Sequence, residues 1–350
     1  MSDKVREAFR DQVRYCEQLG SPFTARVCRL CLDALSDTTP IARTILDWPG
    51  DPSAHADSLP LRVAGALHHL ARTGQSQPLR WAYPPTLVDD AALGGAIAQA
   101  FREHDATIRA YLTSPPQTNE VMRSAALLPG LLTIARRTQL PLELYEIGSS
   151  AGLNLVLDRY RYEFGSTRWG SADAPLQIKP EWSGDPPPVH APLNVVARSG
   201  VDLNPVDLRA PAARDRLLSY VWPDQEDRMH RLELAIASWL RDPPSIERGD
   251  AAQWLAQSRI ARATPNVTRV LFHSVTWSYL PGTTKQSITD FMRETGARAT
   301  KSAQLAWLRF ELSAKGADLR LATWPDGSDE LLAAAHPHGT LVRWMPDQGI

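Results

Sequence analysis

Residues 142–155 read LELYEIGSSAGLNL, and this stretch decides the fold class. Its first six residues are an apolar run of the length of a buried parallel strand. Residues 148–152 then form a turn of small residues, and apolar positions continue at helical spacing as far as Tyr160. A strand, a glycine turn and a helix in this order direct backbone N–H groups at a ligand.

Two functional interpretations of the turn compete. In the first it is the glycine-rich loop of a methyltransferase that uses S-adenosylmethionine (SAM): the strand ends in the acid Glu146, and Gly148 and Gly152 let the cofactor approach the backbone. In the second it is a nucleophile elbow, because residues 148–152 match G-x-S-x-G with Ser150 as nucleophile. A tight turn without a ligand is the third interpretation, so the rest of the chain has to decide.

Composition indicates a soluble globular protein without a charge pattern for nucleic acid or membranes. The chain has 350 residues, of which 43% are hydrophobic and 22% charged, which suits one or two domains with a sizeable core. Its net charge of −1 provides no basic field for nucleic acid or an anionic membrane. The longest apolar stretch, 125–135, is short and contains Pro129, and the first ten residues lack a signal-peptide core. We therefore expect a cytoplasmic protein without a membrane span.

The first 115 residues read as a helical domain, which would serve as a lid or bind substrate. Apolar residues recur at three- and four-residue steps in the first eighteen positions. The pair Ser21-Pro22 is a good start for a second helix. Further helices are expected over 61–72 and 87–103, with residues 81–85 as a loop. Cys28 and Cys31 lie on an apolar helix face without a second ligand pair, so they indicate core rather than a metal site.

Residues 116–350 read as a second, Rossmann-like domain. Thr118 or Asn119 can cap a helix that continues to Arg136, and short strand-like runs follow. Helices between the first strands predict an open, mainly parallel α/β sheet, and short turns between the last ones predict an antiparallel edge. Residues 165–190 form a loop insertion or a small hairpin. The expected strands are 142–147, 193–198, 245–249, 268–274, 305–312, 319–324 and 341–345.

Acids follow the ends of the first three strands, at Glu146, Asp202 and Asp250. In an open α/β sheet the ligand lies beyond these carboxyl ends. The pattern is typical of SAM-dependent methyltransferases, in which the second acid accepts the ribose hydroxyls and the third accepts the adenine amino group. Asp202 lies 56 positions after Glu146 where about 20 is usual, so the insertion must loop out for Asp202 to reach the site; otherwise Asp202 only forms a turn.

Other residues complete the candidate site. Ser149 and Asn154 belong to the predicted cofactor-binding turn, and Arg123 can pair with the methionine carboxylate of SAM. His273 and Tyr279 follow the fourth strand, where they would position or deprotonate the methyl acceptor, although His273 can equally be a strand-end histidine whose hydrogen bonds are satisfied.

The hydrolase interpretation needs a histidine beside Ser150. Asp250 with His273, His336 or His338 could complete a triad. No His-Gly-Gly segment precedes the elbow to form an oxyanion hole, and Glu146 would be buried near the nucleophile without a partner. We therefore rank a SAM-dependent methyltransferase of a small molecule first, with a serine hydrolase or a non-catalytic binding protein as alternatives.

Three segments resemble a bacterial family. They are Thr118-Asn-Glu-Val-Met-Arg-Ser-Ala-Ala, Glu146 to Tyr160, and Val221-Trp-Pro-Asp-Gln with Arg228. They are similar to the domain-of-unknown-function family numbered 2332, and the resemblance covers most of the chain. It implies a Rossmann-like fold and supplies no reaction. Met122 stands where a glycine is expected, which puts in doubt only a close helix contact there.

Overall fold

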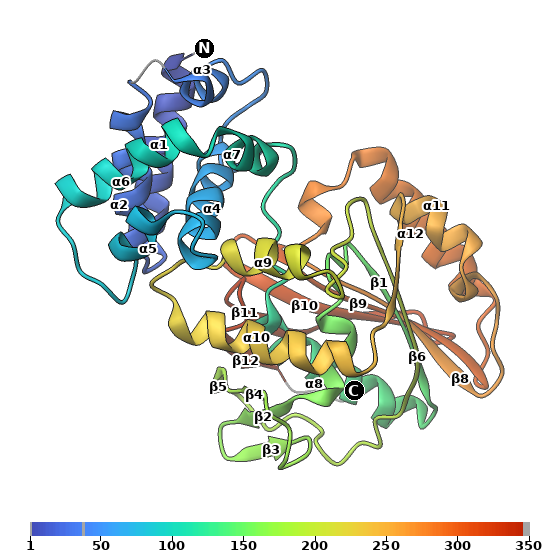
Figure 1. Cartoon of the computed structure of the whole chain (residues 1–350). Helices are drawn as coiled ribbons and strands as arrows, with labels where there is room; N and C mark the ends of the chain where they lie inside the picture. Colours follow the sequence, from blue (N-terminus) through green and yellow to red (C-terminus); the bar gives the residue numbers. More distant parts are fainter. Residues whose placement is uncertain (1, 37–38, 346–350) are drawn as a thin grey trace. The chain divides into compact units, whose positions relative to one another are not determined.

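The chain folds into two compact units. The computed structural model describes residues 2–36 and 39–345 (Figure 1). The first unit contains the chain up to Thr118 together with Arg209–Glu233, and the second contains Asn119–Leu208 and the chain from Leu234 onward. A domain boundary was expected near residue 115, but the return of residues 209–233 to the helical unit was not expected.

The first unit is helical. Val5, Phe9 and Cys16 on the apolar face of the first helix are buried, as are Cys28 and Cys31. Two expected details are wrong: residues 81 and 82 end a helix instead of opening a loop, and the helix expected from 87 begins at 90, where the Asp89 side chain accepts a hydrogen bond from the backbone. The helices are α1 Ser2–Gln18, α2 Pro22–Ala34, α3 Pro40–Leu46, α4 Leu59–Arg72, α5 Gln77–Ala82, α6 Asp90–Glu103, α7 Asp105–Leu112, α9 Pro211–Ser219 and part of α10 Glu226–Arg241.

Buried polar contacts hold the returning segment in the first unit. The Ser219 carbonyl accepts a hydrogen bond from His68 Nδ1 at 3.0 Å, and the Ser219 hydroxyl lies 2.9 Å from that of Tyr111. Gly65 lets the Tyr220 ring approach, because a Cβ at 65 would lie 2.6 Å from it. Burial lowers the pKa of His68 to about 4, so this histidine is neutral at pH 7.

The second unit is built on a large sheet with the strand order β5-β12-β11-β10-β9-β8-β1-β6-β7. The strands β1, β6, β7, β8 and β9 are parallel, and β9 to β12 pair in antiparallel fashion. This confirms the mainly parallel sheet with an antiparallel edge. The strands are β1 Leu142–Ile147, β5 Glu181–Ser183, β6 Val195–Asp202, β7 Ser245–Arg248, β8 Val267–Ser274, β9 Ala303–Ser313, β10 Gly316–Trp324, β11 Ser328–Ala335 and β12 Leu341–Trp344.

The five parallel strands define where a ligand would lie. Taken in chain order, they have the spatial order 3-2-1-4-5, which is the order of the Rossmann fold. The order reverses between β1 and β8, so the topological switch point lies at their carboxyl ends. The turns after β1, β6 and β8 are therefore the segments that position the site.

Helices cover the two faces of this sheet. Because side chains alternate along a strand, Tyr145 and Ile147 share one face of β1 and Glu146 projects from the other. The first face packs on α11 Ala251–Gln257 and α12 Gly282–Ala297, which lie side by side (Figure 1). The helix α8 Ser124–Thr138 contacts β9 and β10.

The insertion between β1 and β6 is a small separate sheet. It contains β2 Arg161–Phe164, β3 Thr167–Trp169 and β4 Gln177–Ile178, with Tyr162 and Phe164 buried. The helix expected after the glycine turn is only a kinked 3-10 segment, η2 Asn154–Arg159. The small sheet takes up the long spacing before Asp202, which therefore ends a strand adjacent to β1.

Two kinds of feature are missing from the part of the chain that the structure describes. Residues 2–36 and 39–345 contain no helix long and apolar enough to cross a membrane. Within the same ranges, no group of three or more His, Cys, Asp or Glu residues could hold a metal ion.

Candidate functional site

The glycine turn closes directly onto the neighbouring strand β6. Gly148 has φ +64° and Ser150 has φ +53°, so the chain reverses through two left-handed residues. Between them Ser149 is fully buried; its backbone N–H and its hydroxyl both donate to the Val201 carbonyl, at 3.1 and 3.3 Å. Ser149 therefore holds the turn in place and has no hydroxyl hydrogen left for a cofactor.

Glu146 is a buried carboxyl group at the carboxyl end of β1. Only 2% of the residue is exposed, and its Oε2 atom has no hydrogen-bond partner among the described residues. Burial is the main cause that raises the pKa of Glu146 well above its ordinary value; the Asp202 charge adds to this, and the Arg123 charge opposes it. Burial therefore favours the neutral form of Glu146 more than in a free carboxyl group, and a bound cation or hydrogen-bond donor would oppose this effect.

Asp202 lies on the same face of the sheet as Glu146. Glu146 pairs with Gly200 in the register of β1 and β6, and Asp202 follows two residues later with the same side-chain direction. Asp202 Oδ2 accepts the Ser150 N–H at 2.8 Å, and its Oδ1 accepts the Asn204 N–H at 2.8 Å. Asp202 thus ties the β6 end to the glycine turn, and two carboxyl groups meet at this edge.

Ser150 does not have the environment of a hydrolase nucleophile. Its hydroxyl is buried and has no hydrogen-bond partner among the residues that the structure describes. A nucleophilic serine needs a base within hydrogen-bond reach, and none of His273, His336 and His338 forms a hydrogen bond with the Ser150 hydroxyl. The histidine that the hydrolase interpretation needs beside Ser150 is therefore not found among the described residues.

The two glycines of the turn are explained by packing against protein atoms. A Cβ at Gly148 would lie 2.4 Å from Thr276 Cγ2, in the turn after β8. A Cβ at Gly152 would lie 2.6 Å from Ile246 Cδ1 on β7. We predicted that the missing side chains make room for a cofactor, but in these two directions the room is filled by Thr276 and Ile246. The approach of a ligand would have to use other faces of the turn.

Asn154 and Arg123 differ in how far their polar atoms form hydrogen bonds within the protein. Asn154 is 1% exposed, and its Oδ1 atom lacks a hydrogen-bond partner among the described residues. Arg123 Nε donates to the Pro337 carbonyl at 3.1 Å, and its Nη1 donates to the Ser274 carbonyl at 3.0 Å. Arg123 therefore has a structural role, because it connects its own segment to Pro337 and Ser274. The predicted role as partner of a ligand carboxylate would come in addition to it.

Asp250 is the N-cap of α11. Its Oδ1 atom accepts the N–H groups of Ala252 and Gln253 at 2.9 and 3.0 Å. Its Oδ2 atom accepts no hydrogen bond from the described residues and is the oxygen left to accept an adenine amino group. The cap was not predicted, because Asp250 was assigned to ligand binding, although an Asp directly before a helix is the usual sequence signal for an N-cap.

Both ring nitrogens of His273 have hydrogen-bond partners within the protein. His273 is 0% exposed and lies on the face of the sheet opposite Glu146, with Trp277 stacked on its ring at 5.2 Å. Its Nε2 accepts from Trp307 Nε1 at 3.1 Å, so the ring proton is on Nδ1, which lies 2.5 Å from Glu311 Oε1. With both nitrogens engaged, His273 is not placed to deprotonate an acceptor, which favours the alternative of a satisfied strand-end histidine.

Glu311 is a site residue that sequence reasoning missed. Besides His273, it accepts the backbone N–H groups of Thr276, at 3.0 Å, and Trp277, at 3.1 Å. These bonds hold Val275 at φ +51°, a conformation that a β-branched residue rarely adopts. The available signal was an acid within the apolar strand β9, close to its carboxyl end. The predicted acceptor residue Tyr279 follows this turn and is 70% exposed.

Asn119 is the second residue with a missed role. We expected Thr118 or Asn119 to cap the following helix, but the Glu120 side chain accepts the Met122 N–H at 3.0 Å and caps η1 Val121–Arg123 before α8 begins. Asn119 Oδ1 instead accepts the Leu153 N–H at 3.0 Å. The Thr-Asn-Glu motif therefore reaches the glycine turn, a contact that no local sequence signal reveals.

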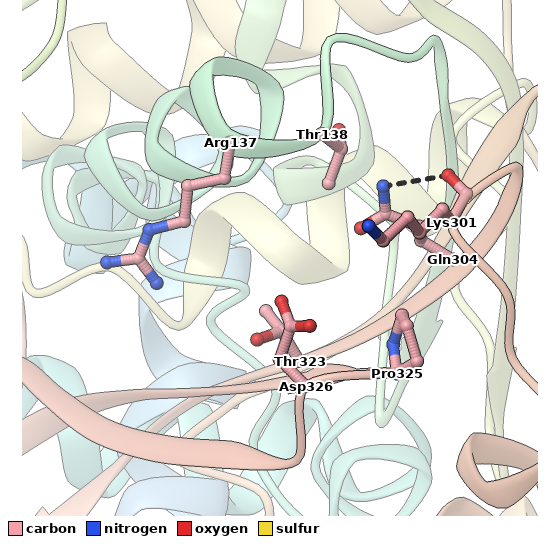
Figure 2. A pocket seen from close by; sticks show the side chains of 7 residues that line it. All are labelled: Arg137, Thr138, Lys301, Gln304, Thr323, Pro325 and Asp326. Atoms are coloured by element: carbon pink, nitrogen blue, oxygen red, sulfur yellow. Dashed lines mark hydrogen bonds between the residues drawn. The ribbon is translucent and has the colours of Figure 1, made fainter.

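A separate pocket of about 230 Å³ lies at the opposite edge of the sheet (Figure 2). Its walls come from the end of α8, the start of β9 and the end of β10. No predicted site residue lines it, and ligands of open parallel sheets bind at the carboxyl edge instead. The lining residues are Arg137, Thr138, Lys301, Gln304, Thr323, Pro325 and Asp326.

Comparison with known proteins identifies a family and no activity. No curated protein matches the chain. Residues 6–344 match the model of a family described as "Uncharacterized protein conserved in bacteria", DUF2332. The match includes both the Thr-Asn-Glu segment and the glycine turn that meet in the structure. The chain therefore belongs to this bacterial family, DUF2332.

Proposed function

We propose that this protein transfers a methyl group from SAM to a small-molecule acceptor, with the cofactor bound at the carboxyl ends of β1 and β6. One observation carries the proposal. Glu146 Oε2 is a buried acceptor without a partner among residues 2–36 and 39–345, beside the Asp202 carboxylate at the end of the next strand. A buried polar atom without a partner is costly, so a ligand donor is the expected complement.

The residues at this edge fit the polar groups of SAM. Glu146 would accept a hydrogen bond from the ammonium group or a hydroxyl. Asp202 ends the second parallel strand, the position at which Rossmann-like folds bind ribose hydroxyls. Asp250 retains its Oδ2 atom for the adenine amino group. Asn154 Oδ1 is a further buried acceptor on the same turn.

The protein's own contribution would be binding and orientation. When bound, SAM supplies an electrophilic methyl group, and the chain has to align the acceptor with it and exclude water. Tyr279, exposed on the turn after β8, is the candidate for positioning the acceptor. His273 receives no role as a base, because Trp307 occupies its Nε2. The acceptor would therefore have a nucleophile that is unprotonated at the working pH.

Titration calorimetry with S-adenosylhomocysteine tests the proposal. Wild type should bind, and Glu146→Gln should lower the affinity by roughly tenfold or more, because a charge-assisted hydrogen bond contributes about 1.5–3 kcal/mol. Glu143→Gln is the matched control: it removes another buried glutamate of β1, one whose partners Tyr145 and Arg259 lie on the opposite face. Equal losses in the two variants would remove Glu146 from the site.

The pH dependence adds a second test. Because the pKa of Glu146 is raised without ligand, binding an ammonium group would release its proton. Wild-type affinity should therefore rise as pH increases toward that raised pKa, while the affinity of Glu146→Gln should not change with pH.

Labelling of Ser150 by a serine-directed probe would favour a hydrolase instead. Absence of any nucleotide binding would favour a protein that only binds partners.

A further inference from the structure

The segment from Asn119 to Arg123 spans the switch point of the sheet. At one end Asn119 accepts the Leu153 N–H, and at the other Arg123 donates to the carbonyl of Ser274, the last residue of β8. Asn119 adopts φ +40°, which turns its carboxamide toward the glycine turn. The segment therefore connects the turn after β1 with the turn after β8.

The Leu153 N–H needs this acceptor. Leu153 is 0% exposed and directly follows Gly152, which is left-handed at φ +73°. Two nearby N–H groups are satisfied within the turn: Gly152 donates to Ser149 O at 2.7 Å and Leu155 donates to Gly152 O at 3.1 Å. Without the Asn119 oxygen, the buried Leu153 donor would lose its partner and the turn would relax to recover one.

We propose that Asn119 is a positioning residue that fixes the shape of the glycine turn for ligand binding. The inference rests on the proposed function, because the ligand is the one assigned to that turn. Asn119 acts through Leu153, whose neighbour Asn154 presents a buried acceptor that no described residue contacts by a hydrogen bond. The shape of residues 148–154 then depends on a side chain from a distant part of the sequence.

Asparagine meets two requirements at this position. It tolerates a left-handed backbone better than most residues, and its side chain supplies an acceptor. Aspartate also meets both requirements, glycine meets only the backbone one, and alanine meets neither. The series Asn119→Asp, Asn119→Gly and Asn119→Ala therefore separates the hydrogen bond from the backbone conformation.

Asn266 provides a matched control. It has φ +59° and lies just before β8, at the opposite edge of the sheet from the glycine turn. Its side chain makes no hydrogen bond with the described residues, while its backbone N–H donates to Ser302 O. Asn266→Gly therefore makes the same chemical change at a left-handed turn without removing an acceptor from the candidate site.

The experiment measures S-adenosylhomocysteine affinity by calorimetry and the hydrogen-exchange rate of the Leu153 amide by NMR, on the full chain. Asn119→Gly and Asn119→Ala should each lower the affinity by about tenfold or more and speed exchange at Leu153 by a similar factor, as expected for losing one buried hydrogen bond. Asn119→Asp and Asn266→Gly should leave both quantities within about threefold of wild type.

The two readouts separate the two hypotheses. If Leu153 exchanges as slowly in Asn119→Gly as in wild type, Asn119 does not hold the turn and the inference is wrong, whatever ligand binds. Fast exchange combined with wild-type affinity also overturns it, because the turn would then not control binding. If wild type itself fails to bind S-adenosylhomocysteine while Asn119→Gly speeds exchange at Leu153, the proposed cofactor is wrong. The result would still support the inference that Asn119 fixes the shape of the glycine turn.

Discussion

Gly148→Ala should destabilise the protein through a specific collision. The added Cβ would lie 2.4 Å from Thr276 Cγ2 and 2.6 Å from its Oγ1, and the residue keeps φ +64°. The left-handed conformation costs alanine roughly 1–2 kcal/mol, and forcing a packed side chain aside costs about 1–3 kcal/mol. The free energy of unfolding should therefore fall by about 2–5 kcal/mol.

A double-mutant cycle isolates the collision. Thr276→Ala removes both atoms that the new Cβ would strike, so the double variant should recover about 1–3 kcal/mol of the loss. Gly327→Ala is the control for strain alone, because Gly327 has φ +72° and nothing lies within 4 Å of its ideal Cβ; it should cost only about 1–2 kcal/mol. Urea denaturation gives the unfolding free energies of wild type, of the two single variants and the double variant of the cycle, and of Gly327→Ala. Equal losses for Gly148→Ala and Gly327→Ala, or no recovery with Thr276→Ala, would refute the reasoning.

Three further predictions concern the carboxyl and hydroxyl groups of the site. Asp250→Ala should lower the free energy of unfolding by about 0.5–2 kcal/mol through loss of the α11 cap, whereas Asp250→Ser keeps the cap; equal denaturation midpoints for the two variants would exclude the cap. Glu146 has a raised pKa, so its contribution to stability is fully present below pH 4.5 and is lost as pH rises through the raised value. Glu146→Gln should thus gain stability relative to wild type as pH rises above 4.5, and a pH-independent difference in thermal denaturation would contradict the burial argument. Ser150→Ala removes a buried hydroxyl that has no hydrogen-bond partner in the described part of the chain, so it should neither destabilise the fold nor weaken S-adenosylhomocysteine binding; loss of an esterase activity in this variant would support the hydrolase.

Local sequence signals were sufficient for the elements around the glycine turn. The run 142–147 is β1 with the predicted bounds, because six apolar-rich residues between two helices can bury both faces only in the middle of a sheet. The mainly parallel sheet also followed from the alternation of strands and helices. The order of acids after successive strands placed Glu146 and Asp202 at one edge, since the carboxyl ends of neighbouring parallel strands coincide.

Element bounds and the insertion were predicted less well. The strand expected at 193–198 extends to Asp202, and β11 was not anticipated, because the run DELLAAA has weak strand propensity and is stabilised by pairing with β10. The helix expected after the glycine turn is short and kinked, since the chain there leaves for the small sheet. In these segments strand pairing and the path of the chain, and not local propensity, decided the structure.

The sequence by itself determined the fold class, the strand that ends at Glu146 and the turn that follows it, because these depend on apolar periodicity and on glycine at neighbouring positions. Only the tertiary structure decided what the polar side chains do. His273 is engaged by Trp307 and Glu311, the Gly148 turn is packed by Thr276, and Asn119 reaches Leu153. The physical reason is that a hydrogen bond or steric contact depends on which atoms lie within about 4 Å, and the folded sheet brings these partners together from distant parts of the chain.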